Sequence, residues 1–137
     1  MEVVAVPDYR RYIVEVGTGV DLHGEDATEA AQRAVRDAIG RVSMVGLMQL
    51  FDASSFREVE DALMVDVTVA LPHTGAVDRD AVLSVLPEGR RRITVVEGGM
   101  RFPTPQTAEE ARTHGILVAV AVIVVLVDVS RIPFRTG

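Results

Sequence analysis

The sequence contains no cysteine, and all 14 of its basic residues are arginine, so lysine is absent as well. Without cysteine the chain has no disulfide, no thiolate ligand for zinc and no cysteine nucleophile. Without lysine it has no side-chain amine that could form a Schiff base with a carbonyl substrate. These absences exclude cysteine-based and lysine-based covalent mechanisms.

A net charge of −6 separates this chain from proteins that bind nucleic acids. Phosphate backbones are held by a basic protein surface, and 14 arginines against 20 acidic residues do not favour one. We therefore expect a small polar molecule, and no nucleic acid, as the partner of this protein.

At 137 residues the chain is long enough for one domain with a substantial core. We expect a single domain over residues 1–137, with flexible or edge tails at 1–9 and 130–137. Hydrophobic residues make up 48% of the sequence against 25% charged, toward the apolar end for a globular protein. Because so small a domain leaves apolar surface to cover, we expect a homo-oligomer.

The longest apolar run extends from Ile116 to Val127. A membrane-spanning helix needs about 20 such residues, and the many valines favour a strand that is buried on both faces. The start at Met1-Glu2-Val3 shows no basic region followed by a long apolar stretch, as a secretory signal would. We therefore expect no membrane association and a cytoplasmic location.

The hydrophobic pattern predicts the element order β-α-β-α-β-β. The clearest element is a helix that begins after Asp26, carries Glu29 in a capping-box position and ends at Gly40. A shorter helix follows a cap at Asp78. Strands are expected at residues 11–16, 63–71, 92–97 and 116–127; residues 41–61 fit either a short helix or a loop, and residues 107–112 fit one helical turn.

These elements predict an α+β domain. Strand–helix–strand units cross over with one handedness, so the first three strands should run parallel, with both main helices on one face. An antiparallel last strand makes the sheet mixed. The carboxyl ends of parallel strands share one edge of a sheet, and ligands gather there.

Polar residues follow each of the predicted parallel strands. The stretch Gly17–Gly24 comes after the first strand, His73 after the second, and Glu97 ends the third. An antiparallel last strand would bring His114 to the same edge. The candidate catalytic residues are His23, Asp21, Glu97 and His73, and the candidate ligand-binding residues are Gly17, Thr18, Gly19, Gly24, Gly98, Gly99 and Arg101.

A structural interpretation is open for each of these residues. Loops lie at strand ends and hold polar residues in any case, and Asp21 can close an Asx turn. Glu25 and Asp26 fit the start of a helix better than a site. Glu97 is harder to explain in this way, because a carboxylate at the end of a buried strand is costly without a partner.

The residues from Gly17 to Gly24 fit the pattern GxGxDxHG. This pattern resembles the signature of a family of small conserved hypothetical proteins of bacteria and plants, and the similarity extends through residues 26–39, 66–72 and 96–99. The element order is also similar to the chorismate-mutase-like fold and, more distantly, to the domains of ring-opening amidohydrolases. The chorismate-mutase-like resemblance implies a trimer or larger assembly with sites between subunits.

Three functions fit these residues. The first is an acid–base enzyme of hydrolase, cyclase or isomerase type. In it the His23 imidazole transfers the proton, Asp21 orients that imidazole, and Glu97 is a second acid or base. Backbone N–H groups of residues 17–19 would hold an oxyanion. The second function is the same chemistry with a metal ion bound by Asp21, His23, His73 and Glu97. Apart from this metal ion, no cofactor is expected. The third is a non-catalytic ligand-binding or assembly module.

Overall fold

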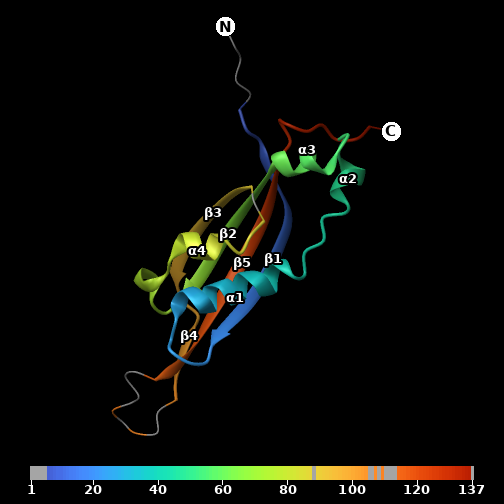
Figure 1. The fold of residues 1–137 in the computed structure, drawn as a ribbon. Coiled ribbons are helices and arrows are strands. Elements are labelled where there is room, and N and C mark those ends of the chain that lie inside the picture. Colours follow the sequence, from blue (N-terminus) through green and yellow to red (C-terminus); the bar gives the residue numbers. More distant parts are fainter. Residues whose placement is uncertain (1–5, 88, 105–106, 108, 110–113, 137) are drawn as a thin grey trace.

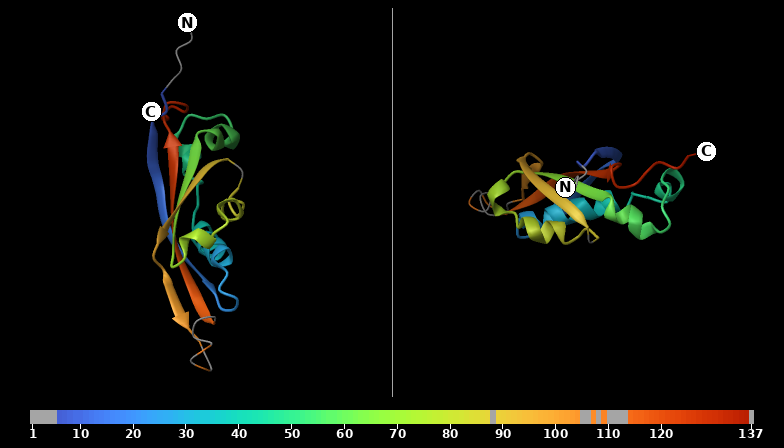
Figure 2. Two further views of the ribbon diagram at one scale, coloured as in Figure 1. Left: turned by 90° about the vertical axis from the view of Figure 1, so that its left-hand side faces the viewer. Right: turned by 90° about the horizontal axis from the view of Figure 1, so that it is seen from above.

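The computed structural model of the protein consists of one mixed β-sheet with helices packed on one face (Figure 1). It describes residues 6–87, 89–104, 107, 109 and 114–136. In the left view of Figure 2, the helices of the described residues all lie on the same side of the sheet. This arrangement confirms the predicted α+β fold with its helices on one face.

The sheet is built from β1 (Tyr9–Asp21), β2 (Leu63–Leu71), β3 (Arg90–Glu97), β4 (Met100–Pro103) and β5 (Gly115–Asp128). The strand order is β1-β5-β2-β3. The central strand, β5, runs antiparallel to β1 and β2, whereas β2 and β3 are parallel. The first three long strands therefore run in one direction, as the sequence predicts. β4 was not expected; it pairs with β5 beyond the point where β2 ends.

The helices are α1 (Ala27–Ile39), α2 (Leu47–Leu50), α3 (Phe56–Asp61), the 3₁₀ turn η1 (Thr74–Ala76) and α4 (Arg79–Leu83). α1 and α4 are the two predicted helices, with their caps at Asp26 and Asp78. Both α2 and α3 fall in residues 41–61, which the sequence left open as a short helix or a loop. At the start of α3, Ser55 and Glu58 have capping-box spacing, and the Ser55 hydroxyl accepts a hydrogen bond from the Glu58 N–H.

An alanine-rich face lets α1 pack directly on the backbone of β1. A Cβ atom at Gly17 would stand 2.3 Å from the Ala34 carbonyl oxygen, and one at Gly19 would stand 2.2 Å from that of Ala30. Only glycine fits at such a close approach. The sequence pattern suggested that these glycines end the strand. They do not, because β1 continues to Asp21.

Three charged side chains, two from α1 and that of Arg41 just after it, bind the outer edge of β1. The contacts are Arg33 Nη1 to the Val20 carbonyl (2.6 Å), the Thr18 N–H to Asp37 Oδ2 (2.9 Å) and Arg41 Nη1 to the Val16 carbonyl (2.6 Å). Backbone groups that an edge strand leaves open are thus satisfied within the chain. This half of the edge is blocked against pairing with a strand of another molecule.

The C-terminal segment, expected as a tail, folds back on the domain. Ile132 is buried, and the Phe134 ring stacks on Phe51 with ring centroids 4.9 Å apart. At the other terminus, the Asp8 N–H donates to the buried Asp128 carboxylate at 2.9 Å. Residues 1–5 and most of the predicted helical turn at 107–112 lie outside the described residues.

The sheet face that the helices leave bare is apolar, and we call it the open face. Strand register places there the alternate residues of β5, which are half-buried, whereas those facing the helices are fully buried. None of the helices in the described segments is long and apolar enough to cross a membrane. The open face comprises Val14, Val16, Thr18 and Val20 of β1, Ile116, Val118, Val120, Val122 and Val124 of β5, Asp66, Thr68 and Ala70 of β2, Arg92, Thr94 and Val96 of β3, and Met100 and Phe102 of β4.

Candidate functional site

Two of the three histidines line one hollow at the end of the sheet where β1 and β4 flank the start of β5. The hollow has a volume of about 210 Å³. His23 enters it from the loop after β1, and His114 from the residue before β5; both side chains are exposed. The lining residues are Leu22, His23, Gly24, Thr104, His114 and Gly115.

An ion pair between Glu25 and Arg101 lies beside this hollow. The two side chains contact the backbone of Gly115, since a Cβ atom there would stand 2.7 Å from Glu25 Oε1 and 3.2 Å from the guanidinium carbon of Arg101. Arg101 Nη2 is buried and has no hydrogen-bond partner among the described residues. Buried donors are nearly always satisfied, so this nitrogen is an exception among the described residues, although Arg101 does not itself line the hollow.

The loop that carries His23 is held in an uncommon backbone conformation. Gly24 has a φ of 85°, and Glu25 has a φ of 48°, the one positive φ of a described non-glycine residue. The buried Asp21 carboxylate accepts a hydrogen bond from the Asp26 N–H at 2.7 Å and lies 3.6 Å from Arg33 Nη1. A strained loop that a buried carboxylate fixes at both ends is typical of a functional site.

Asp21 therefore positions the loop. Its carboxylate is committed to the Asp26 N–H and to Arg33, and it is buried rather than presented to the hollow. The bond reaches backbone five residues along, farther than the two residues of an Asx turn, so Asp21 closes the whole loop that carries His23.

Most of the glycines proposed to bind a ligand serve the packing of the backbone. Gly17 and Gly19 admit α1, as described above, and the N–H of Thr18 between them donates to Asp37. Gly98 and Gly99 form the crossing from β3 to β4, where a Cβ atom at Gly99 would stand 2.3 Å from the Val118 carbonyl oxygen. Of the predicted ligand-binding residues, Gly24 lines the hollow and Arg101 lies beside it.

Glu97 and His73 lie away from the hollow because β5 inserts between β1 and β2. Glu97 pairs with Leu71 on the edge strand β3, three strands across from β1. At about 3.3 Å per residue and about 4.8 Å between strands, the backbones of Glu97 and His23 are on the order of 20 Å apart. The predicted convergence of the strand ends therefore fails for Glu97, and His73 is exposed and does not line the hollow.

The alternative metal site is not formed within one chain. Among the described residues, no group of three or more histidines and carboxylates is placed to hold a metal ion. Asp21, His23, His73 and Glu97, the residues proposed for it, all belong to the described part of the chain. The separation of the strand ends accounts for this result.

The sequence interpretation overlooked Thr104 and assigned Glu25 to the helix start. Glu25 sits in the loop before the cap and reaches across to Arg101. Its position next to the GxGxDxHG stretch was the available indication. Thr104 gave none, because it enters the hollow only through the pairing of β4 with β5.

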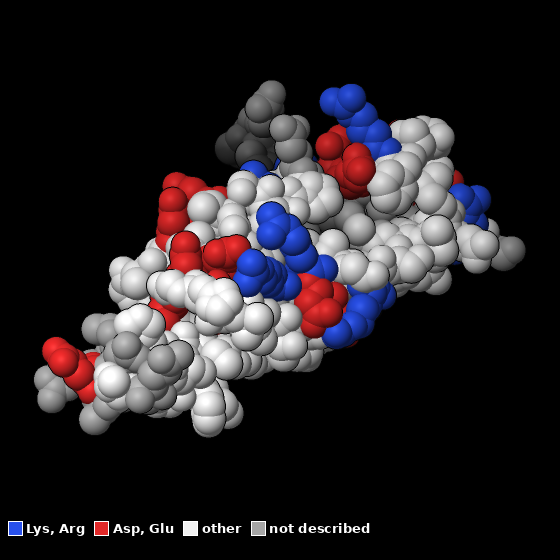
Figure 3. Space-filling model, turned by 60° about the horizontal axis from the view of Figure 1, so that its bottom comes forward, with Lys and Arg blue, Asp and Glu red and all other residues white. Residues whose placement is uncertain are grey.

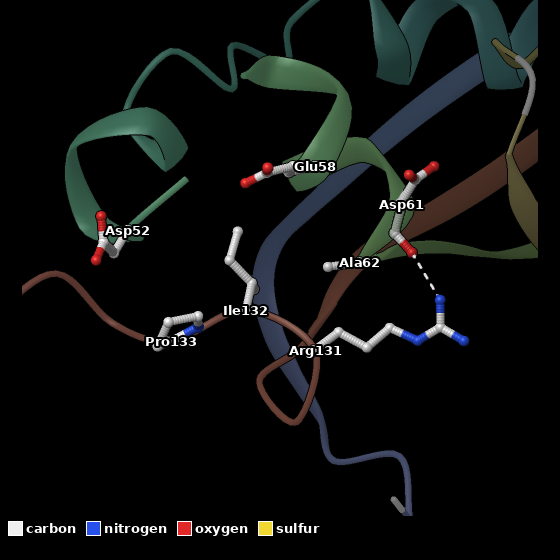
Figure 4. A pocket seen from close by; sticks show the side chains of 7 residues that line it. All are labelled: Asp52, Glu58, Asp61, Ala62, Arg131, Ile132 and Pro133. Carbon is white, nitrogen blue, oxygen red and sulfur yellow. Dashed lines mark hydrogen bonds between the residues drawn. The ribbon is translucent and has the colours of Figure 1, made fainter. Parts of the chain in front are cut away.

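A second polar hollow of about 330 Å³ lies at the opposite end of the sheet (Figure 4). The view shows the side chains of Asp52, Glu58 and Arg131 around it, and Arg131 Nη1 donates to the Asp61 carbonyl at 3.5 Å. A hydrogen bond from the Ser54 hydroxyl lowers the pKa of the Glu58 carboxyl. With Glu58 already engaged and no histidine among its lining residues, this hollow offers less chemistry than the first.

The charged surface carries no extended field of one sign on the face shown in Figure 3. Basic and acidic side chains lie next to one another there. Ion pairs of this kind include Arg33–Glu29 (2.6 Å) on α1 and Arg41–Asp37 (2.8 Å) at its C-terminal end.

Comparison with known proteins identifies relatives over most of the chain. The sequence model of a family described as conserved hypothetical protein, the Lin0512 family, matches residues 11–125, which include every residue that lines the hollow. The crystal structure of an FtsZ-like protein of unknown function from Nostoc punctiforme is similar, with a TM-score of 0.75 and 34% sequence identity. The similarity covers 90% of this chain and 99% of that one. None of the curated proteins matches.

Proposed function

Since the chain belongs to the Lin0512 family of conserved hypothetical proteins, a description that states no activity, we propose its function from the hollow itself. The protein is an acid–base enzyme of hydrolase, cyclase or isomerase type. Its substrate is a small polar molecule that carries a carboxylate or phosphate. The reaction takes place between His23 and His114.

The observation that supports this proposal is the presence of two histidines in the lining of one hollow, with an arginine beside it. His23 and His114 come from distant parts of the chain and line this hollow. Imidazole is the side chain best suited to transfer protons near neutral pH. Arg101 adds a positive charge beside the hollow, and its planar guanidinium suits an anionic group.

The neighbouring residues give each group a role. Glu25 holds Arg101 in place through the ion pair, and Asp21 keeps the loop in the conformation that directs His23. Thr104 supplies a hydroxyl that can donate to or accept from the substrate. The hollow is smaller than the roughly 300–1,000 Å³ of drug-sized sites, so it takes a very small molecule or one end of a larger one.

Proton transfer within this arrangement requires no cofactor. His23 removes a proton from the substrate or from an attacking water, and the second imidazole returns one to the leaving or rearranged atom. Arg101 stabilises the negative charge that develops. Because both imidazoles are exposed at the hollow, each can exchange its proton with solvent between turnovers.

A non-catalytic module is the second candidate function. The open face favours it, because an apolar sheet surface supports assembly whether or not the hollow performs chemistry. The two functions differ in what the histidines contribute: a binding module tolerates their replacement if other groups carry the affinity.

Histidine variants with a matched control test the proposal. Small amides, esters, lactones and enolisable ketones, each carrying a carboxylate or phosphate, are incubated with the protein, and products are followed by NMR. His23→Gln is expected to lower turnover by at least about 100-fold, since it removes a proton-transfer group. His73→Gln, which removes an exposed histidine outside the hollow, is expected to leave turnover unchanged.

The controls separate chemistry from folding. Both variants should keep the circular dichroism spectrum and melting temperature of the unmodified protein, because both replaced side chains are exposed. Turnover that survives in His23→Gln, or that falls equally in His73→Gln, would contradict the assignment. Binding of a panel compound without turnover, unchanged by loss of both His23 and His114, would favour the non-catalytic module.

A further inference from the structure

The open face is a continuous apolar surface. Its rows run across the sheet, with Val16 beside Val122 in one row and Val20, Val118 and Met100 beside one another in another. Met100 and Phe102 are each 58% exposed. Contiguous apolar surface of this kind on a soluble chain marks a site of protein association.

The residues that make up the open face carry little charge. Its two charged residues, Asp66 and Arg92, lie on neighbouring strands and pair with each other at 3.0 Å, and the further charges on this side of the sheet, Arg11 and Arg90, lie in the next row beyond it. The remaining polar residues are threonines. A neutral, largely valine surface has nothing with which to attract a nucleic acid or an anionic membrane, and it is complementary to another neutral apolar surface.

The β1 edge of the sheet disfavours pairing with a strand of a partner, which leaves the open face as the surface for association. Arg33, Asp37 and Arg41 occupy the outer backbone groups along the carboxyl half of β1. A partner strand cannot extend the sheet there, because those backbone groups are already bonded. Face-to-face packing leaves these side chains undisturbed.

The accessible surface area of the chain is larger than that of a compact monomer of the same mass. The accessible surface is 8609 Å² for a mass of 14.8 kDa. Compact monomers of that mass expose about 7,000 Å², or about 1,600 Å² less. A stable interface buries about 800 Å² on each partner. The total covers the whole chain, so the part of it on the open face is the part that counts toward an interface.

We propose that the open face is the docking surface for a second copy of this chain. The two sheets pack face to face at the spacing of about 10 Å found in β-sandwiches, with valine side chains of one copy between those of the other. The helices then lie on the outside of the assembly. The core of each subunit is completed by its neighbour, independently of the chemistry proposed for the hollow.

Charge inserted into the open face tests this directly. Val16, 47% exposed in the single chain, is replaced in Val16→Arg, and Val45, 80% exposed and outside the open face, is replaced in Val45→Arg as the matched control. Analytical ultracentrifugation at micromolar concentration should show the unmodified protein and Val45→Arg as a dimer or larger. Val16→Arg should raise the dissociation constant by about 100-fold or more, because it buries an unpaired charge.

Thr18→Arg repeats the test at a second exposed position of the open face, so that one poorly folded variant does not decide the outcome. Circular dichroism establishes that each variant is folded. An unmodified protein that stays monomeric at high micromolar concentration would overturn the proposal. So would folded Val16→Arg and Thr18→Arg variants that assemble as tightly as Val45→Arg.

Discussion

The two faces of the sheet share the same strands but are built from different side chains. Toward the helices, β1 presents Gly17 and Gly19, and β5 presents Ala119 and Ala121; toward the open side, both strands present valine. The small residues exist because α1 approaches the backbone directly. The valines of the open face pack against no helix of the described chain. One face is thus complete in a single subunit, and the other is not.

This difference corrects the expectation for the central strand. Its many valines suggested burial on both faces, but in the single chain the open-side residues from Ile116 to Val124 are only half-buried, and burial on both sides is confined to the end of β5, residues 125–128. The valine-rich composition of β5 therefore reflected the open face, which no other part of the described chain covers. Burial by a second copy would restore the two-sided pattern that the sequence implies.

The largest expected effect is a clash on the helix-covered face. Gly19→Ala puts a Cβ atom 2.2 Å from backbone atoms of Ala30 and Ala34, which cannot move without shifting α1. We expect the free energy of unfolding to fall by about 3 kcal/mol or more, measured by chemical denaturation. Gly75→Ala is the matched control: nothing lies within 4 Å of its Cβ, and its cost should stay below about 0.5 kcal/mol. Equal costs for the two variants would contradict the close packing of α1 on β1.

Asp21→Ala should have the next largest effect. The change leaves the Asp26 N–H without its acceptor and removes the ion pair between Asp21 and Arg33. Loss of a buried acceptor costs about 2 kcal/mol in the free energy of unfolding. Because Asp21 also holds the His23 loop, turnover of any substrate found should fall as well. A variant with unchanged stability would show that Asp21 does not anchor this loop.

The other buried carboxylate, Asp128, provides a pH-dependent test at the opposite end of the sheet. Burial acts to raise the pKa of its carboxyl, but hydrogen bonds from Ser130 and the Asp8 N–H, with the charge of Arg131, outweigh it and lower the pKa. A carboxyl whose pKa is lower in the folded state stabilises the protein above its unfolded value of about 3.9, and this contribution is lost as the pH falls further.

For Asp128→Asn we therefore expect a loss of about 1–2 kcal/mol in the free energy of unfolding at neutral pH. The gap to the unmodified protein should close as the pH is lowered below about 4, because the unmodified carboxyl is then protonated as well. Denaturation curves of both proteins at several pH values measure it. A gap that is independent of pH would mean that the charge of Asp128 contributes nothing.

The smallest effect compares one substitution on the two faces. Val69→Thr places a hydroxyl at a fully buried, helix-facing position, and should cost about 1–2 kcal/mol. Val96→Thr makes the same change on the open face, where the side chain is 40% exposed, and should cost less than about 0.5 kcal/mol in dilute protein. Denaturation at the lowest practical concentration measures both. Equal costs would mean that the faces do not differ in the single chain.

Local sequence rules predicted the elements whose residues act on their immediate neighbours. The start of α1 followed from Asp26 and Glu29, and the predicted residues 63–71 are those of β2. β1 was predicted too short, because its glycines allow the close approach of α1 and do not form a turn. The short strand β4 was missed because its pairing partner, β5, lies in a distant part of the sequence.

The candidate site was predictable only in part, for a topological reason. Successive strand–helix–strand units suggested that the ends of the first three strands meet, but β5 separates β1 from β2 and β3. His23 and Arg101 therefore remain near the hollow, while Glu97 does not. Strand order depends on contacts between distant residues, which hydrophobic periodicity does not encode. Likeness to the chorismate-mutase-like fold stays a prediction.

The contrast between the two faces is tested most directly by calorimetry over a wide range of protein concentration. If the open face is buried against a second copy, association and folding are linked, and the melting temperature must rise with concentration. The Val16→Arg variant should lose this dependence. A melting temperature of the unmodified protein that is the same at every concentration would contradict the claim that its core is completed by another subunit.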